Sequence, residues 1–135
     1  MNRKIRVLIV DDEPHIRKMV SLVMEQLKTE VVGMARDGEQ GVEMFRELKP
    51  DLVLMDVNMP RMKGTEALKL MHEASPNTPI IMLTSLVATD VVVECLDAGA
   101  RNYLRKDTPP KEMRTLIRET WNEHVRAKKS KKQDL

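Results

Sequence analysis

The sequence predicts a single α/β domain of the (βα)5 type, in which five parallel strands alternate with five helices in a doubly wound sheet. Short, nearly all-apolar runs rich in β-branched residues recur along the chain, as in strands buried on both faces of a parallel sheet. Longer stretches with apolar residues at helical spacing separate these runs. Strands connected by helices cross over right-handedly and form a layered sandwich. The length of 135 residues fits one hydrophobic core.

The strand pattern occurs five times. The first, third and fourth runs are the most uniformly apolar, whereas the second and the last are less regular. The five predicted strands are Ile5–Val10, Val31–Met34, Leu52–Met55, Ile80–Leu83 and Asn102–Leu104.

Each predicted strand is followed by a stretch with apolar residues three or four positions apart. Pro50 ends the second helical stretch, Gly64 and Pro76 bound the third, Gly99 ends the fourth, and Pro109-Pro110 begins the fifth. The predicted apolar stripes are Ile16, Met19, Val20, Val23, Met24 and Leu27; Val42, Phe45 and Leu48; Ala67, Leu68 and Met71; the segment Thr89–Ala98; and Met113, Leu116, Ile117, Thr120, Trp121 and Val125.

Charge and composition exclude several classes of protein. The formal net charge is only +2, and its excess lies in a basic tail, so we expect no direct binding of nucleic acid or membrane by the domain. We expect the domain to span residues 1–125, with 126–135 as a solvated helix end or a linker stump. Cys95 is the single cysteine, and no apolar run approaches the ~20 residues of a membrane span. These features favour a cytoplasmic protein.

Acidic residues follow two of the predicted strands at the point where each strand ends. Asp11, Asp12 and Glu13 come directly after the first strand, and Asp56 comes directly after the third. In open α/β sheets, ligands bind outside the carboxyl ends of the strands. Converging carboxylates repel one another unless a cation intervenes, and Mg²⁺ prefers oxygen ligands. The pattern predicts a magnesium site, although Asp12 before Pro14 also fits a helix N-cap.

Two further strand ends supply complementary groups. Thr84 and Ser85 follow the fourth strand with hydroxyl donors, and Lys106 lies just beyond the fifth with a point positive charge. A carboxylate beside a divalent cation, an ammonium and a hydroxyl can attack phosphorus as a nucleophile. Phosphoryl transfer mainly requires alignment and neutralisation of charge on the equatorial oxygens. The sequence therefore predicts phosphoryl-transfer chemistry at this edge of the sheet.

These motifs together resemble response regulator receiver domains of two-component systems. Val10–Pro14 resembles the family's opening acidic pair, and Asp56–Gly64 resembles its phosphoacceptor loop. Thr84-Ser85 resembles its hydroxyl-plus-small-residue pair, and Ala98–Ala100 with Tyr103 and Lys106 resembles the segment that leads to its lysine. The resemblance covers residues 5 to about 125. It implies the flavodoxin-like, CheY-like fold with strand order 2-1-3-4-5.

The resemblance implies a role for each matching residue. Asp56 would accept a phosphoryl group from a sensor histidine kinase or a phosphotransfer protein. Mg²⁺ would be held by Asp12 directly, by Asp11 through water, by Asp56 and by the backbone carbonyl of Asn58. Lys106 would pair with a phosphoryl oxygen. The chain would catalyse only its own phosphorylation and dephosphorylation.

The resemblance also implies a switch. Thr84 would turn toward the phosphoryl group and Tyr103 would move inward behind it, which would alter the surface formed by the fourth helix, the fifth strand and the fifth helix. That surface could bind an output protein, an effector domain outside this chain, or a second copy in a homodimer. Asn58 and Leu86 occupy the positions that tune the lifetime of the aspartyl phosphate. Leu86 cannot position a water molecule, so we expect slow autodephosphorylation.

The sequence departs from the family pattern at one point. Many members have Lys-Pro with a cis peptide bond, whereas this chain has Lys106-Asp107 followed later by Pro109. A cis bond before a residue other than proline costs about 3 kcal/mol. The sequence therefore does not predict whether the Lys106 amine extends far enough to contact a phosphoryl group on Asp56.

Two other functions fit parts of the pattern. A Mg²⁺-dependent phosphohydrolase with an aspartyl nucleophile usually has Asp-x-Asp-x-Thr/Val after its first strand, a pattern absent from Asp11–His15. A receiver-like protein that is never phosphorylated would be expected to lack one of the acceptor, acidic, hydroxyl or lysine residues, and all are present.

In the fourth helix, apolar residues are too many for one inward stripe, so at least one valine, such as Val93, should face water.

Overall fold

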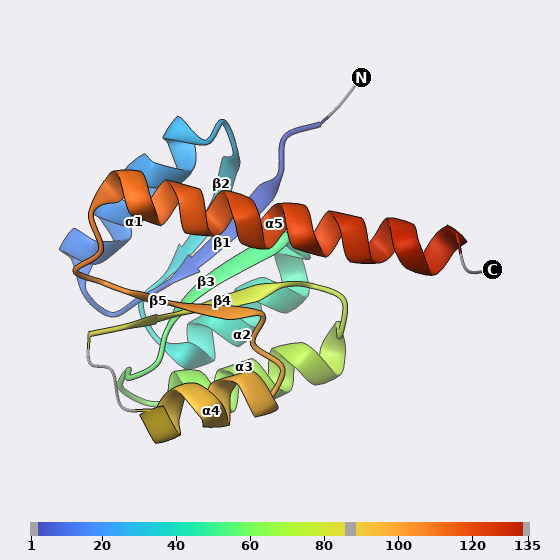
Figure 1. The fold of residues 1–135 in the computed structure, drawn as a ribbon. Helices are drawn as coiled ribbons and strands as arrows, with labels where there is room; N and C mark the ends of the chain where they lie inside the picture. Colours follow the sequence, from blue (N-terminus) through green and yellow to red (C-terminus); the bar gives the residue numbers. More distant parts are fainter. Residues whose placement is uncertain (1–2, 86–88, 134–135) are drawn as a thin grey trace.

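The computed structural model describes the chain over residues 3–85 and 89–133, with side chains described to residue 130. Strands and helices alternate strictly along the chain (Figure 1). Their bounds are β1 Arg6–Val10, α1 Pro14–Gln26, β2 Glu30–Ala35, α2 Gly38–Leu48, β3 Leu52–Asp56, α3 Gly64–Ala74, β4 Ile80–Thr84, α4 Thr89–Asp97, β5 Asn102–Arg105 and α5 Pro110–Gln133.

The strands form one parallel sheet in the order β2-β1-β3-β4-β5, which confirms the predicted fold. In β3 and β4 every residue is buried, and in β1 only Arg6 is partly exposed. The two strands with the weakest sequence pattern, β2 and β5, lie at the edges of the sheet. Their partial exposure explains why their sequences are less uniformly apolar.

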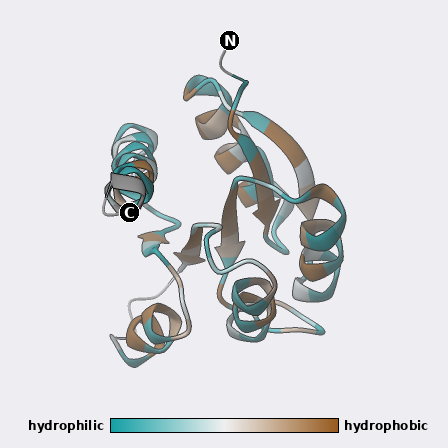
Figure 2. Cartoon of the chain, turned by 90° about the vertical axis from the view of Figure 1, so that its right-hand side faces the viewer, coloured by the Kyte–Doolittle hydropathy of each residue, from teal (hydrophilic) through white to brown (hydrophobic). Residues whose placement is uncertain are grey.

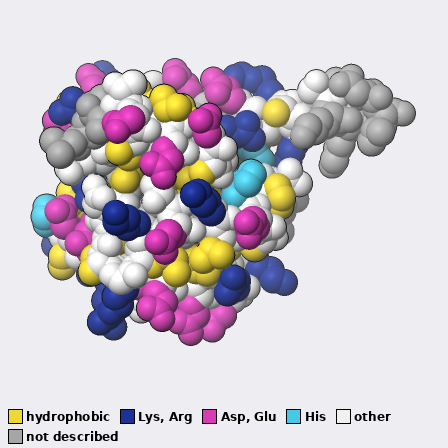
Figure 3. All heavy atoms as spheres, turned by 90° about the horizontal axis from the view of Figure 1, so that it is seen from below, with side chains coloured by type: hydrophobic (Ala, Val, Ile, Leu, Met, Phe, Trp, Pro, Cys, Tyr) yellow, Lys and Arg dark blue, Asp and Glu magenta, His cyan; other side chains and the backbone are white. Residues whose placement is uncertain are grey.

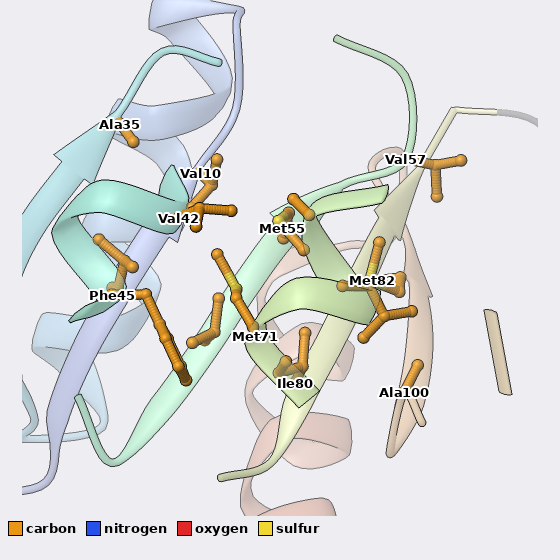
Figure 4. Packing of buried hydrophobic residues seen from close by; sticks show 14 of the residues in the cluster. Val10, Ala35, Val42, Phe45, Met55, Val57, Met71, Ile80, Met82 and Ala100 are labelled. Carbon is orange, nitrogen blue, oxygen red and sulfur yellow. The ribbon is translucent and has the colours of Figure 1, made fainter. Parts of the chain in front are cut away.

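Helices cover both faces of the sheet (Figures 1 and 2). On one face, α1 and α5 pack against side chains such as Ile9, Leu54 and Leu83. On the other face, α2, α3 and α4 pack against residues of the same strands that point the opposite way. Figure 4 shows this second core, where Met55, Met71 and Met82 come from β3, α3 and β4. All three methionines are fully buried, and their unbranched, flexible side chains fill space between the helices and the sheet.

The last helix is longer than the predicted apolar stripe. Its inward side chains are Met113, Ile117, Thr120 and His124, and Asn102 Nδ2 donates to Thr120 Oγ1 at 3.0 Å, which joins the helix to β5. The C-terminal part of the helix projects past the sheet (Figure 1), and the side chains of residues 126–130 are exposed. The backbone of the basic tail is therefore helical as far as Gln133, and the domain boundary at residue 125 remains a prediction.

Helix α4 exposes part of its apolar surface, as its sequence predicted. Cys95 is buried and Val91 packs against the core, whereas Val93 and Leu96 are 49% and 42% exposed.

Of the helices that the structure describes, none combines the length and apolarity needed to cross a bilayer. Figure 3, a view from below Figure 1, shows acidic and basic side chains interspersed with small apolar patches on that face.

One predicted local feature is wrong. Asp12 does not cap α1: the N-cap residue is Glu13, and no side chain caps this helix end. Pro14 occupies the first turn, so the residue directly before it takes the N-cap position and Asp12 lies one residue too early. The N-cap position therefore belongs to Glu13 and not to Asp12.

Candidate phosphoryl-transfer and metal site

The carboxyl ends of β1 and β3 bring three aspartates together. Asp56 is the last residue of β3, and Asp11 and Asp12 follow β1, its direct neighbour in the sheet. One carboxylate oxygen from each of the three lies within 4.8 Å of the others. Asp11 and Asp56 are 0% and 4% exposed, whereas Asp12 faces solvent. The site is thus a partly buried acidic cluster with one open side.

Lys106 reaches this cluster from the end of β5. Its Nζ lies 3.0 Å from Asp11 Oδ2, 3.1 Å from Asp56 Oδ2 and 3.4 Å from Glu13 Oε2. The backbone N–H of Lys106 donates to Thr84 O at 2.8 Å, which holds the lysine beside the end of β4. Residues 3–85 and 89–133 contain no cis peptide bond, so the bond between Lys106 and Asp107 is trans. The Lys106 amine nevertheless reaches Asp56.

The charges of the cluster shift the proton affinities of its members. Burial, followed by the charge of Asp11 and a hydrogen bond with Asp12, raises the pKa of Asp56 to about 7 although Lys106 opposes this. Burial likewise raises the pKa of Asp11. For Lys106, burial alone would lower the pKa, but its contacts with Asp11 and Asp56 outweigh burial and raise it. The Lys106 ammonium therefore interacts with two nearly buried carboxylates, those of Asp11 and Asp56.

The two carboxylate oxygens of Asp11 are used differently. Asp11 Oδ1 accepts the Glu13 N–H at 2.8 Å, and Arg17 Nη1 donates to the Asp11 carbonyl at 2.7 Å. Buried Oδ2 accepts no well-aligned hydrogen bond within the described residues, even though the Lys106 amine is near. Three carboxylates, one of them open to water, fit the all-oxygen ligand set of Mg²⁺.

The loop between β3 and α3 closes over the site from one side. Val57 N–H donates to Leu83 O at 3.0 Å, and Gly64 N–H donates to Val57 O at 2.8 Å. A Cβ atom on Gly64 would lie 2.0 Å from the carbonyl oxygen of Asp56, so this close approach requires glycine. Within the loop, Asn58 N–H lies 3.3 Å from Asp56 Oδ1. The Asp56 carboxylate is thus bounded by its own loop.

Of the other predicted site residues, Thr84 and Tyr103 lie on β4 and β5. Thr84 ends β4, one position beyond the residue that pairs with Asp56, and is 8% exposed. Tyr103 lies on β5 opposite Met82 and is 37% exposed. Leu86 lies outside the described residues.

Two contacts involve residues that have no predicted role. Glu13 approaches Lys106, and its position directly after Asp12 could have indicated this. Arg61 Nη1 donates to Asp37 Oδ2 at 3.0 Å, across 24 positions of the chain. No local sequence pattern predicts a pair of charges so far apart.

A family model described as "Response regulator receiver domain" matches residues 7–118. The chain belongs to the response regulator receiver family. It is thus a receiver domain of the two-component type, as the motifs indicated. The matched segment runs from β1 into α5 and contains all of the site residues described above.

Curated relatives extend this assignment. The receiver is 43% identical over 120 residues to an uncharacterized transcriptional regulatory protein, YxjL, of Bacillus subtilis, covering 87% of this chain and 55% of that protein. It is 39% identical over 105 residues to the chemotaxis protein CheY of Thermotoga maritima, covering 78% of this chain and 88% of CheY. The chain thus spans about half of the first relative and most of the second.

Solved structures share the fold over nearly the whole receiver. A CheY-like receiver domain protein of Methanospirillum hungatei superposes with a TM-score of 0.86 at 30% identity, covering 93% of this chain and 99% of that one. A CheY in a CheX-CheY-BeF3-Mg²⁺ complex from Borrelia burgdorferi gives a TM-score of 0.83 at 26% identity, covering 87% and 89%. The fold is therefore that of CheY-like receivers.

Proposed function

We propose that this receiver accepts a phosphoryl group on Asp56 from a phosphohistidine, with Mg²⁺ as cofactor, and thereby changes its output surface. The observation that supports this most strongly is the position of the Lys106 amine, 3.1 Å from the Asp56 carboxylate at the acidic cluster. A buried nucleophile with an ammonium beside it and a cation-compatible set of oxygens provides what phosphoryl transfer requires.

In the proposed reaction, an Asp56 oxygen attacks phosphorus as the bond from phosphorus to the histidine nitrogen breaks. Lys106 neutralises charge on one equatorial oxygen, and the Thr84 hydroxyl donates to another. Asp11, Asp12, Asp56 and the Asn58 carbonyl would hold the metal ion. Bound Mg²⁺ would reduce the repulsion among the carboxylates and stabilise the charge that develops on the phosphoryl oxygens.

The output surface of the proposal consists of α4, β5 and α5. Tyr103 is partly exposed there, and a groove of about 470 Å³ between β5 and α5 is lined by residues that include Asn102, Leu116 and Thr120. We propose that Thr84 and Tyr103 turn inward on phosphorylation, which reshapes this surface. Its partner would be an output protein, an effector domain or a second receiver in a homodimer.

The proposed setting is the cytoplasm, where a sensor histidine kinase or a phosphotransfer protein would supply the phosphoryl group. The chain would be no enzyme beyond its own phosphorylation and dephosphorylation. One relative is named protein-glutamate methylesterase/protein-glutamine glutaminase 3 of Geobacter sulfurreducens, and the chain covers only 34% of it. We therefore transfer no methylesterase activity to this chain.

The test is incubation with acetyl phosphate and Mg²⁺, followed by intact-mass measurement. We expect a gain of one phosphoryl group in the wild type, and none in Asp56→Asn or when EDTA replaces Mg²⁺. An equal gain in the Asp56→Asn variant would contradict the assignment of the acceptor. No gain in the wild type, with beryllofluoride also failing to perturb Trp121 fluorescence, would contradict the function.

A further inference from the structure

A charged pair joins the loop between β3 and α3 to the start of α2. Arg61 Nη1 donates to Asp37 Oδ2 at 3.0 Å, while Asp37 Oδ1 accepts the Gln40 N–H at 2.8 Å as the N-cap of α2. The Asp37 side chain is 4% exposed and that of Arg61 is 62% exposed. Both oxygens of a buried carboxylate are thus used, one by the helix and the other by the loop.

The backbones of the two segments are also in direct contact. A Cβ atom on Gly38, the first residue of α2, would lie 2.4 Å from the carbonyl oxygen of Met62. The absence of a side chain at residue 38 therefore lets the loop lie directly on the first turn of the helix. The ion pair at residue 61 holds the loop in this contact.

Arg61 has a backbone conformation that is unfavourable for its side chain. Its φ of +68° lies in the left-handed region, where glycine or asparagine is the usual choice for a turn. A strained residue persists when the surrounding contacts hold it, and such residues occur often at functional sites. The contact with Asp37 is an interaction of Arg61 that glycine could not make.

The loop held in this way carries Asn58, whose backbone carbonyl is one of the proposed metal ligands. Asn58 precedes Arg61 by three residues, and its N–H lies 3.3 Å from Asp56 Oδ1. A displacement of the loop at Arg61 would therefore move the Asn58 carbonyl relative to the three aspartates. Metal affinity depends on such outer contacts because they orient the ligands.

We propose that the Arg61–Asp37 ion pair is a positioning device for Mg²⁺ binding, which holds the loop so that the Asn58 carbonyl faces the acidic cluster. Arg61 and Asp37 are thus positioning residues that touch neither the metal ion nor the phosphoryl group. The inference rests on the proposed function because it takes Asn58 as a metal ligand.

The test is a double-mutant cycle read out as the dissociation constant of Mg²⁺ alone, measured by isothermal titration calorimetry. The variants are Arg61→Gln, Asp37→Asn and the two combined. Asparagine at residue 37 keeps an acceptor for the Gln40 N–H while it removes the charge that faces Arg61. We expect each single variant to weaken Mg²⁺ binding about fivefold, and the double variant to be no weaker than either single one.

Two controls separate positioning from stability. Arg3→Gln removes another arginine–aspartate pair, in which Arg3 lies 2.8 Å from Asp51. Asp51 directly precedes β3, so this pair lies at the opposite end of the strand from Asp56. Arg3→Gln should leave the Mg²⁺ affinity unchanged. Arg61→Gly removes the pair and also relieves the left-handed strain, so it should weaken Mg²⁺ binding without lowering the melting temperature.

The outcomes distinguish this inference from the function on which it rests. Normal Mg²⁺ binding and Asp56 modification in the wild type, with unchanged Mg²⁺ affinity in Arg61→Gln, would overturn the inference alone. Additive losses in the double variant, or an equal loss in Arg3→Gln, would also overturn it. A wild type that neither binds Mg²⁺ nor takes up a phosphoryl group would overturn both proposals.

Discussion

At the scale of single residues, the acidic cluster makes Asp56 costly to ionise in the absence of metal. Its pKa of about 7 lies above the value of ~3.9 for an unfolded chain. The folded protein therefore holds a proton that the unfolded chain releases between these two values. The stabilisation that comes from this proton is complete at low pH and is lost as the pH rises toward 7.

Asp56→Asn should therefore stabilise the metal-free protein in a pH-dependent way. We expect a gain in the free energy of unfolding on the order of 1 to 3 kcal/mol at pH 8 in EDTA, and a much smaller gain at pH 5. Urea denaturation of both proteins at the two pH values measures this difference. Equal gains at both pH values would contradict the raised pKa of the Asp56 carboxyl group.

Residue 86 should set the lifetime of the phosphorylated form. A leucine there offers no hydrogen bond to an attacking water molecule, so Leu86→Gln should speed the loss of the phosphoryl group several-fold. The decay can be followed by intact mass after acetyl phosphate is removed, with Leu86→Met as the apolar control. An unchanged decay rate in Leu86→Gln would contradict this role.

At the scale of elements, strand β5 carries Tyr103 on the proposed output surface, and in this structure the ring is partly exposed. Phosphorylation should make it less accessible. We expect beryllofluoride with Mg²⁺ to reduce acrylamide quenching of tyrosine fluorescence in a Trp121→Phe background, where Tyr103 is the single tyrosine. The same quenching with and without beryllofluoride, under conditions where the mimic binds, would exclude this movement. Asp56→Asn serves as the control.

Helix α5 divides into a packed part and a projecting part. His124 is buried, with its ring 5.4 Å from that of Trp121 and Nδ1 3.3 Å from Arg101 Nη2, whereas residues 126–130 are exposed. A chain ending at Val125 should therefore keep its stability to within about 0.5 kcal/mol.

The matched control for that truncation is a chain ending at Glu123, which also loses His124 and should cost about 2 kcal/mol. Thermal or urea unfolding of the three chains measures both effects. A large loss already in the chain ending at Val125 would move the domain boundary further along α5.

At the scale of the whole molecule, the sequence predicts the architecture because its signals are repeated and local. Buried strands are continuous apolar runs, such as Leu52–Met55, and Pro50, Gly64 and Gly99 lie close to the ends of helices. The carboxyl ends of parallel strands meet at one edge, so the convergence of Asp11, Asp12 and Asp56 also follows from the pattern.

The structural features that the sequence does not predict depend on contacts between distant segments or on single positions. The Arg61–Asp37 pair joins two loops, and nothing in either loop identifies its partner. The N-cap of α1 is Glu13 and not the expected Asp12, because Pro14 at the start of the helix places the N-cap at the residue directly before it. The approach of Lys106 to Asp56 without a cis peptide bond depends on the path of the chain after β5.

The central claim is that the carboxylate of Asp56 carries the phosphoryl group. Borohydride reduces an aspartyl phosphate to homoserine, and peptide mapping by mass spectrometry then identifies the residue that was modified. After treatment with acetyl phosphate and Mg²⁺, we expect homoserine at position 56 and at no other aspartate, with none formed in EDTA. Homoserine at Asp11 or Asp12, or equal amounts with and without Mg²⁺, would contradict the account.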